Sequence, residues 1–202
     1  MTIADISPLL SATLKQGRAM LRSDAAEKIA DFIFAQQTSD LGFRGRSDES
    51  DLYYTSFALD CLCALGRDSQ ARGAGEYLGQ FIEQPPRDLV HLCCLVRSLA
   101  LVRNAACREN TEKHLTAQIH DFRCTDGLFA NRRTDKFGDL YNSFLAALAF
   151  SAAEEDIPDP ESLLRGVKKH QLNKHGFCNN TEKTVAGTPP TAAAVVLLSV
   201  CG

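Results

Sequence analysis

The side chains that could do chemistry gather at two similar joints of the sequence. These joints are "GFRGRSDESDLYYTS" from Gly42 and "NRRTDKFGDLYNS" from Asn131, and each combines arginines, carboxylates and tyrosines. Neighbouring carboxylates can poise a proton for general acid catalysis, and the rigid donor fork of arginine binds anionic oxygens. Two plainer interpretations stay open: the arginines pair with nearby acids in solvent, and the aspartates cap helices.

The candidate residues occupy matching places in the two joints. The first joint supplies Arg44, Arg46, Asp51, Tyr53 and Tyr54, and the second supplies Arg132, Asp139, Tyr141 and Asn142. Tyrosines at one repeated position are first of all packing residues, but aromatic walls also suit an apolar ligand site.

The two joints belong to an internal repeat. "DLYYTSFALDCL" begins at Asp51 and "DLYNSFLAALAF" at Asp139, with fainter copies "DLVHLCCLVRSLALV" from Asp88 and "GTPPTAAAVVLLSV" from Gly187. Gly42-Phe43, "DGLF" and Gly176-Phe177 precede three of the four copies, whereas "QPPRD" precedes the copy at Asp88. Periods of about 40 to 50 residues are typical of one helix pair per repeat.

Helical periodicity is clear along the chain. From Tyr54, apolar side chains recur with helical spacing at Phe57, Ala58, Cys61, Leu62 and Leu65, and Gly66 supplies a stop. A second helix begins at Ser23 or Asp24 and carries the stripe Ala26, Ile29, Ala30, Ile33 and Phe34. No segment alternates with the period of a strand. The sequence therefore predicts an all-α fold of about nine or ten helices in sequential hairpins, with polar loops before the second helix of each pair.

The bulk composition narrows the class of protein. The chain has 202 residues, 45% of them hydrophobic, and a net charge of −3, which provides no basic field for nucleic acid. No apolar segment is long enough to cross a membrane, and residues 1–21 form an amphipathic helix pattern rather than a signal peptide. We expect a soluble cytoplasmic protein. Cys61, Cys63, Cys93, Cys94 and Cys201 lie in apolar runs and are expected to be buried free thiols.

The repeat resembles that of the protein prenyltransferase β-subunits and the squalene or terpene cyclases. The resemblance rests on a helix ending in glutamine, then Gly-Phe, a polar loop, and Asp-x-Tyr-x-Thr opening a small-residue apolar helix, as in "GFRGRSDESDLYYTSFALDCL". It runs from about Asp24 to the C-terminus. It implies a single α/α toroid domain over residues 1–202, with an N-terminal helix at 1–22 and four repeats near 23–66, 67–104, 105–155 and 156–202. Because complete toroids have more repeats, the ring is open or another subunit completes it.

The resemblance also implies site residues. Arg46 takes the place of an arginine that contacts the isoprenoid diphosphate, and Arg44 and Arg132 could add positive charge. In the column that holds zinc ligands in the prenyltransferases, this chain has Tyr54, His91, Asn142 and Pro190, and only His91 can bind a metal. One imidazole cannot hold a catalytic zinc. The Asp-x-Asp-Asp acid of the cyclases is also absent, and "SDESD" from Ser47 is the nearest sequence.

Two functions follow as hypotheses. In the first, the protein binds an isoprenoid diphosphate or another apolar small molecule in a central cavity and transfers or cyclises it, with His91, Asp51 and Asp139 at the reacting end. In the second, it is a non-catalytic module that docks a partner subunit or forms a homo-oligomer. No cofactor is expected in either; zinc and magnesium stay open as alternatives, but no ligand motif in the sequence supports them. His170, His175 and Cys178 fit no common zinc spacing.

Overall fold

The computed structural model describes residues 2–102, 111–172, 175–182 and 184–201. Regular structure in these ranges is helical, apart from isolated bridges between loop residues. The α-helices are α1 (Ile6–Ala19), α2 (Ser23–Phe34), α3 (Leu52–Ala64), α4 (Asp68–Ala71), α5 (Gly75–Gly79), α6 (Leu89–Val102), α7 (Thr111–Ile119), α8 (Leu140–Ala152), α9 (Pro160–Lys169) and α10 (Thr188–Cys201). Three 3₁₀ turns add η1 (Ile3–Asp5), η2 (Arg72–Ala74) and η3 (His120–Phe122).

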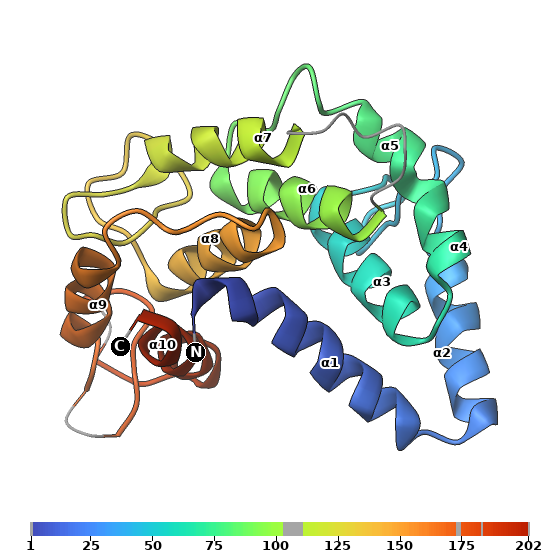
Figure 1. The fold of residues 1–202 in the computed structure, drawn as a ribbon, viewed down its shortest axis with the longest axis horizontal. Coiled ribbons are helices and arrows are strands. Elements are labelled where there is room, and N and C mark those ends of the chain that lie inside the picture. The colour runs from blue at the N-terminus through green and yellow to red at the C-terminus, as the bar shows by residue number, and fades with distance from the viewer. Residues whose placement is uncertain (1, 103–110, 173–174, 183, 202) are drawn as a thin grey trace.

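The helices form two layers around an open arc. Helices α3, α6, α8 and α10 lie side by side in the inner layer, and α2, α4 with α5, α7 and α9 lie outside them (Figure 1). Each outer helix precedes its inner partner in the chain, which gives four helix pairs. The predicted all-α toroid is confirmed in this arrangement. None of the described helices is long and apolar enough to cross a membrane.

The core lies between the two layers and is built mainly by the inner helices. Along α6, the residues Leu89, Leu92, Leu95, Val96 and Leu99 are fully buried or nearly so. A helix that is covered by neighbours on most sides must be apolar almost all round, rather than on one stripe. This explains why the repeat copies that begin at Asp88 and Asp139 contain few polar residues.

The apolar stripe expected along α3 faces the core only in part. Leu62 is fully buried, but Tyr54, Phe57 and Cys61 are exposed. The other buried side chains of α3 are Leu52, Thr55, Ser56 and Leu59. The reason is the position of α3 at the open end of the arc, where no earlier helix pair covers that side. The expectation that Cys61 is buried is therefore wrong. Cys63 and Cys201 are partly exposed, while Cys93 and Cys94 are buried, and the seven described cysteines are free thiols.

Helix α1 lies along the open, concave side of the arc (Figure 1). Its first part, with η1, packs against α8 and α10, and its later part packs against α3. Ile3 and Ile6 are buried, and the backbone N–H of Ser7 donates to Ser151 Oγ on α8 at 2.9 Å. Further along, Leu9 is 51% exposed, so α1 buries only a narrow stripe. The N-terminal helix thus crosses the concave face without filling it.

Candidate functional site

The Gly-Phe loops are held by a hydroxyl group from the inner helix that follows each of them. Thr55, Ser143 and Thr191 accept hydrogen bonds from the backbone N–H groups of Phe43, Phe129 and Phe177, at 2.9, 2.9 and 3.0 Å. The same phenylalanines form isolated bridges to Gln37, Arg123 and Gln171. In the second helix pair, Leu92 takes the place of the hydroxyl residue, which agrees with the missing Gly-Phe entry there.

The predicted helix caps are confirmed at three inner helices. Asp51 accepts from the backbone N–H of Tyr53 and of Tyr54, at 2.9 and 3.1 Å. Asp88 accepts from His91 N at 3.1 Å, and Asp139 accepts from Asn142 N at 2.8 Å. Carboxylates at these positions satisfy free backbone donors and interact favourably with the positive end of the helix dipole.

Asparagines that the sequence reading missed provide a second set of caps. The backbone N–H of Val90 donates to Asn131 Oδ1 at 3.2 Å, and that of Tyr141 donates to Asn179 Oδ1 at 3.0 Å. Asn131 and Asn179 each follow a Gly-Phe loop, two residues after its phenylalanine, but cap the inner helix of the preceding pair. These contacts tie neighbouring helix pairs together. The signal in the sequence that could have identified these caps is that both asparagines stand two residues after the phenylalanine of a Gly-Phe loop.

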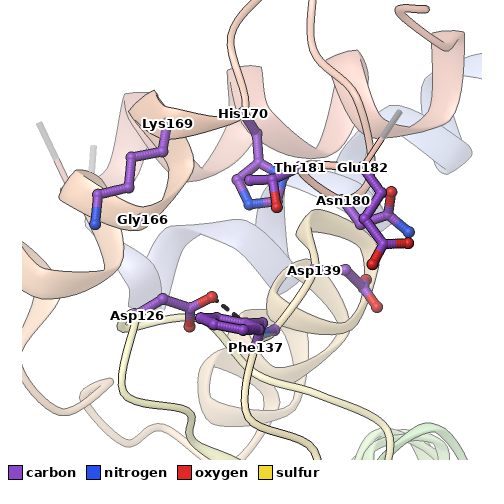
Figure 2. Close-up of a pocket in the computed structure, with 10 residues that line it drawn as sticks. Asp126, Phe137, Asp139, Gly166, Lys169, His170, Asn180, Thr181 and Glu182 are labelled. Atoms are coloured by element: carbon purple, nitrogen blue, oxygen red, sulfur yellow. Dashed lines mark hydrogen bonds between the residues drawn. The ribbon is translucent and has the colours of Figure 1, made fainter. Parts of the chain in front are cut away.

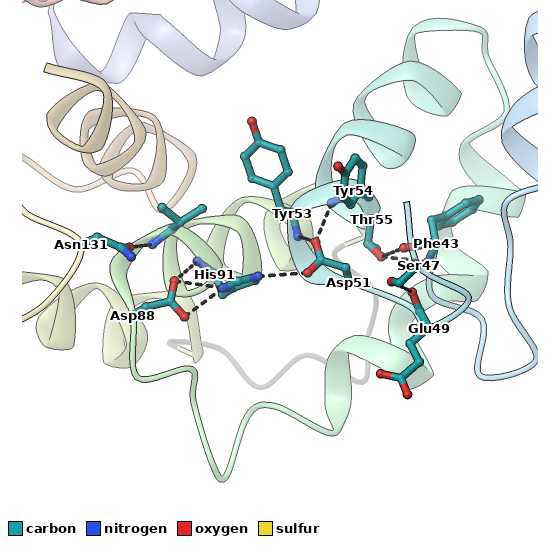
Figure 3. Close-up of polar contacts among 11 residues, drawn as sticks. Phe43, Ser47, Glu49, Asp51, Tyr53, Tyr54, Thr55, Asp88, His91 and Asn131 are labelled. Atoms are coloured by element: carbon teal, nitrogen blue, oxygen red, sulfur yellow. Dashed lines mark hydrogen bonds and ion pairs between the residues drawn. The ribbon is translucent and has the colours of Figure 1, made fainter. Parts of the chain in front are cut away.

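His91 joins two of the capping aspartates (Figure 3). Its Nδ1 lies 2.8 Å from Asp88 Oδ2, and its Nε2 lies 3.1 Å from Asp51 Oδ2. Asp51 begins α3 and Asp88 begins α6, so the imidazole bridges adjacent helix pairs. The structure thereby brings together two of the three predicted catalytic residues, Asp51 and His91.

The two carboxylates determine the charge of His91. The hydrogen bond to Asp88 is the largest effect and, with the added bond to Asp51, raises the pKa of His91 to about 9 against the cost of burial. Burial works against the charged form of Asp88, but hydrogen bonds from His91 hold the pKa of that carboxyl below its usual value. His91 is therefore an imidazolium at neutral pH, with both N–H groups engaged. It has no free nitrogen to accept a proton.

Tyr53 and Tyr141 meet across the inner layer. Their hydroxyl oxygens are 2.8 Å apart, although α3 and α8 are separated by α6. Burial, followed by the hydrogen bond to Tyr53, raises the pKa of Tyr141 above its usual value. Figure 3 shows the hydroxyl end of Tyr53 directed away from the Asp51 carboxylate. The phenol pair therefore forms a separate contact beside the His91 cluster.

The predicted arginines do not converge on this cluster. Arg44 pairs with Asp48 at 3.1 Å and lines a groove of about 190 Å³ between α2 and α3, together with Tyr54. The ring of Tyr54 lies over Gly45, where an added Cβ would come within 2.3 Å of ring atoms. A side chain at position 45 would overlap the ring of Tyr54. Packing therefore explains this glycine in "GFRGR" without any ligand.

The remaining candidates lie elsewhere. Arg46 and Arg132 are exposed in the loops before α3 and α8, and Arg132 contributes its backbone N–H to Asp135 at 3.3 Å. Asn142 is buried and donates to Asp139 Oδ2 at 2.7 Å. Burial raises the pKa of Asp139, and the hydrogen bonds from Asn142 offset this only in part. Asp139 lies at the start of α8, in the third helix pair, and is therefore not part of the cluster of Asp51 and His91.

A buried ion pair on the concave side was not anticipated. Arg97 on α6 is 5% exposed and donates from Nη2 to Asp60 Oδ2 on α3 at 2.6 Å. Arg97 also lines a cavity of about 420 Å³ between α1, α6 and α8. Its wall also includes Ser7, Ser11, Leu101, Ser151 and the carboxylate residue Glu154. No spacing rule pairs residues on different helices, so only the packing reveals this contact.

The residues present do not fit a catalytic zinc. Both ring nitrogens of His91 already contact carboxylates, and no group of three His, Cys, Asp or Glu side chains in the described residues could hold a metal. His170 instead contacts the carbonyl oxygen of Cys178 through Nδ1.

Comparison with known proteins agrees with the geometry. The family model of the prenyltransferase alpha-alpha toroid domain matches residues 9–88 and again residues 76–202. The chain is thus an α/α-toroid protein, and it belongs to the prenyltransferase alpha-alpha toroid family. No curated protein matches it.

Proposed function

We propose that this protein binds an isoprenoid diphosphate, or a similar apolar chain with a polar head, on the concave face of its toroid. The observation that carries the proposal is the cavity of about 420 Å³ beneath α1, which has the size of a small-molecule site and a buried guanidinium, that of Arg97, in its wall. If the protein is an enzyme, the reaction is prenyl transfer or cyclisation. Membership of the family supports this class of ligand.

The polar side chains near the concave face would have different roles in binding the ligand. Among the described residues Arg97 makes one side-chain hydrogen bond, to Asp60, and a guanidinium has five N–H donors, so other donors can meet a polar head group. Tyr53 and Tyr141 add aromatic surface on α3 and α8, outside the wall of this cavity. His91 is a positioning residue in this proposal, because it holds Asp51 and Asp88 and has no free nitrogen.

Calorimetric titration with farnesyl diphosphate, geranylgeranyl diphosphate and farnesol would test the proposal. We expect both diphosphates to bind, farnesol to bind more weakly, and Arg97→Gln to weaken diphosphate binding about tenfold, as for loss of a hydrogen bond to a charged group. Arg46→Ala tests the loop arginine in the same way. Arg165→Ala is the matched control, because Arg165 is exposed on α9 and pairs with Glu161.

Circular dichroism of each variant would separate a lost site from a lost fold. If neither prenyl diphosphate nor farnesol binds to the folded wild-type protein, the proposed function is wrong. Binding that is equal in wild type, Arg97→Gln and Arg46→Ala would reject both arginines as head-group ligands.

A second candidate function is a non-catalytic module that associates with another copy of itself. One edge of the molecule favours it: Phe32 is 68% exposed and Phe57 is 42% exposed, beside the groove between α2 and α3. Within the chain, each inner helix packs against the next, so this uncovered side of the first pair is the surface that another pair would cover. The last pair, α9 with α10, exposes Val195 at the other end.

Light scattering during size-exclusion chromatography tests that function. We expect a dimer or larger assembly at high protein concentration, and a monomer for Phe32→Glu. Phe137→Glu, at another exposed phenylalanine outside this edge, is the control. A wild-type protein that stays monomeric at high concentration would exclude self-association through this edge.

A further inference from the structure

A second cavity lies outside the concave face, between the loops of the third and fourth helix pairs (Figure 2). Its volume is about 350 Å³. Its wall combines the loop before α8, the C-terminal end of α9 and a loop after the third Gly-Phe joint. The side chains that bear charge or can form hydrogen bonds are Asp126, Asp139, Lys169, His170, Asn180, Thr181 and Glu182.

His170 presents a free hydrogen-bond acceptor to this cavity. The residue is 2% exposed, and its Nδ1 lies 3.2 Å from the carbonyl oxygen of Cys178. A carbonyl oxygen only accepts, so Nδ1 carries the hydrogen and Nε2 of the neutral ring is an acceptor. Nε2 has no hydrogen-bond partner among the described residues, and Figure 2 shows the ring directed between the labelled residues of the cavity.

Asn180 lines the cavity and contains a buried acceptor without a partner among the described residues. Its Oδ1 is buried and receives no hydrogen bond from the part of the chain that the structure describes. Buried polar atoms are almost always paired, because an unpaired one has lost its contacts with water. The side chain lies near Glu182 and Asp139 in Figure 2. A ligand with N–H groups in the cavity would satisfy His170 Nε2.

The charged side chains around the cavity indicate that the N–H donors of the ligand belong to a cationic group. Asp139 and Glu182 lie on one side of the cavity, and Asp126 lies on the other side with Lys169 (Figure 2). Asp126 already accepts from the backbone N–H of Leu128 and of Gly138, both at 3.1 Å. Three carboxylates and one ammonium make the lining acidic. The ring of Phe137, 72% exposed, adds an aromatic surface of the kind that attracts cations.

We propose that this cavity binds a small organic cation with N–H donors, a primary amine or a guanidinium. In this site His170 Nε2 and the carboxylates of Asp139 and Glu182 accept hydrogen bonds from the ligand, and Phe137 packs against it. The cavity shares no lining residue with the concave cavity that contains Arg97, so the two proposals stand or fall separately.

Titration with agmatine and putrescine, using 1,4-butanediol and succinate as uncharged and anionic comparison compounds, tests the proposal. We expect the two cations to bind, and Glu182→Gln and Phe137→Ala to weaken their binding about tenfold and about threefold. Lys169→Met is expected to strengthen putrescine binding about threefold, because it removes a like charge. Glu161→Gln, exposed on the same helix α9 but outside the cavity, should change nothing.

The imidazole nitrogens of His170, followed by nitrogen NMR in the wild-type protein, report on the site directly. A shift of the Nε2 signal with agmatine, and none with succinate, is the expected result. Binding of butanediol or succinate as tight as that of the cations would overturn the proposal. So would an absence of cation binding at millimolar concentration, or equal affinities in wild type and Glu182→Gln.

Discussion

At the scale of single residues, His91 concentrates the charge at the start of the inner helices. The imidazolium lies between carboxylates from two helix pairs, and its side chain is 36% exposed. Solvent screens such a pair, so its contribution to stability is modest although the geometry is close. The cluster's main effect is to hold α3 and α6 together at the ends where their loops begin.

The raised pKa of His91 predicts a pH-dependent contribution to folding. The value is about 9 in the folded protein against 6.5 for an unperturbed histidine, so the stabilisation is complete below pH 6.5 and is lost as the pH rises through 9. We expect His91→Gln to lower the free energy of unfolding by about 1 kcal/mol at pH 6, after allowance for screening. By pH 10 this difference should largely disappear.

Urea unfolding of wild type and variant at both pH values provides the measurement. His114→Gln, at an exposed histidine on α7, is the control. A loss of stability that is the same at pH 6 and pH 10 would contradict a charged role for His91.

The Tyr53 and Tyr141 hydroxyl groups should be coupled energetically. Their oxygens are 2.8 Å apart, so removing one hydroxyl leaves the other without this partner. A double-mutant cycle with Tyr53→Phe and Tyr141→Phe should give a coupling energy of about 1 kcal/mol in urea unfolding. Replacing Tyr53→Phe by Tyr54→Phe in the cycle should give additive effects, and a coupling near zero for both pairs would refute the contact.

At the scale of elements, each Gly-Phe loop depends on one hydroxyl from the helix that follows it. Thr55 Oγ1 is buried and lies 2.9 Å from Phe43 N, so Thr55→Val leaves a buried N–H without its acceptor. We expect a loss of about 1 to 3 kcal/mol in the free energy of unfolding. Thr55→Ser keeps the hydroxyl and should lose less, and an equal loss in both variants would assign the effect to packing alone.

The two asparagine caps predict that each substitution speeds amide hydrogen exchange at the start of a different helix. Asn179→Ala should cost about 1 kcal/mol and speed exchange of the amides of Leu140 and Tyr141, which begin α8. Asn131→Ala should instead affect Leu89 and Val90, which begin α6. Mass spectrometry of exchanged peptides can distinguish the two helices, and faster exchange in the same helix for both variants would contradict the assignment.

At the scale of the whole molecule, α1 crosses the concave face of the arc (Figure 1). Its N-terminal end is held by Ile3, Ile6 and the contact of Ser7 with Ser151, whereas Leu9 remains half exposed. Segments with few buried contacts open at lower free energy than the core. Ligand entry into the cavity beneath α1 is therefore expected to involve movement of this helix rather than of the inner helices.

Hydrogen exchange can test whether α1 opens more readily than the inner helices. We expect amides of α1 to exchange about tenfold or more faster than those of α6 under native conditions. Ser151→Ala, which removes the hydroxyl that Ser7 N contacts, should speed exchange in α1 further. Ser199→Ala, which removes an exposed hydroxyl on α10, should not, and equal protection of α1 and α6 would show that α1 is part of the rigid core.

The sequence by itself determined the fold class and the local contacts. Helical periodicity and the repeated Asp-Leu-Tyr joint predicted an all-α fold of helix pairs, because these features depend on neighbours a few residues apart, and the resemblance of the repeat to the prenyltransferase and cyclase families implied the toroid. The caps at Asp51, Asp88 and Asp139 were predictable for the same reason. Asn131 and Asn179 had a repeated spacing but act on another helix pair, which no local rule describes.

Only the tertiary structure decided which of the candidate residues share a site. It placed His91 between Asp51 and Asp88, moved Arg44 and Tyr54 to the groove beside α2, and left Asp139 with Asn142 near a different cavity. It also exposed Cys61 and buried Arg97 against Asp60. These outcomes depend on how helix pairs stack and where the arc ends, and burial and ion pairing between distant segments follow from that packing.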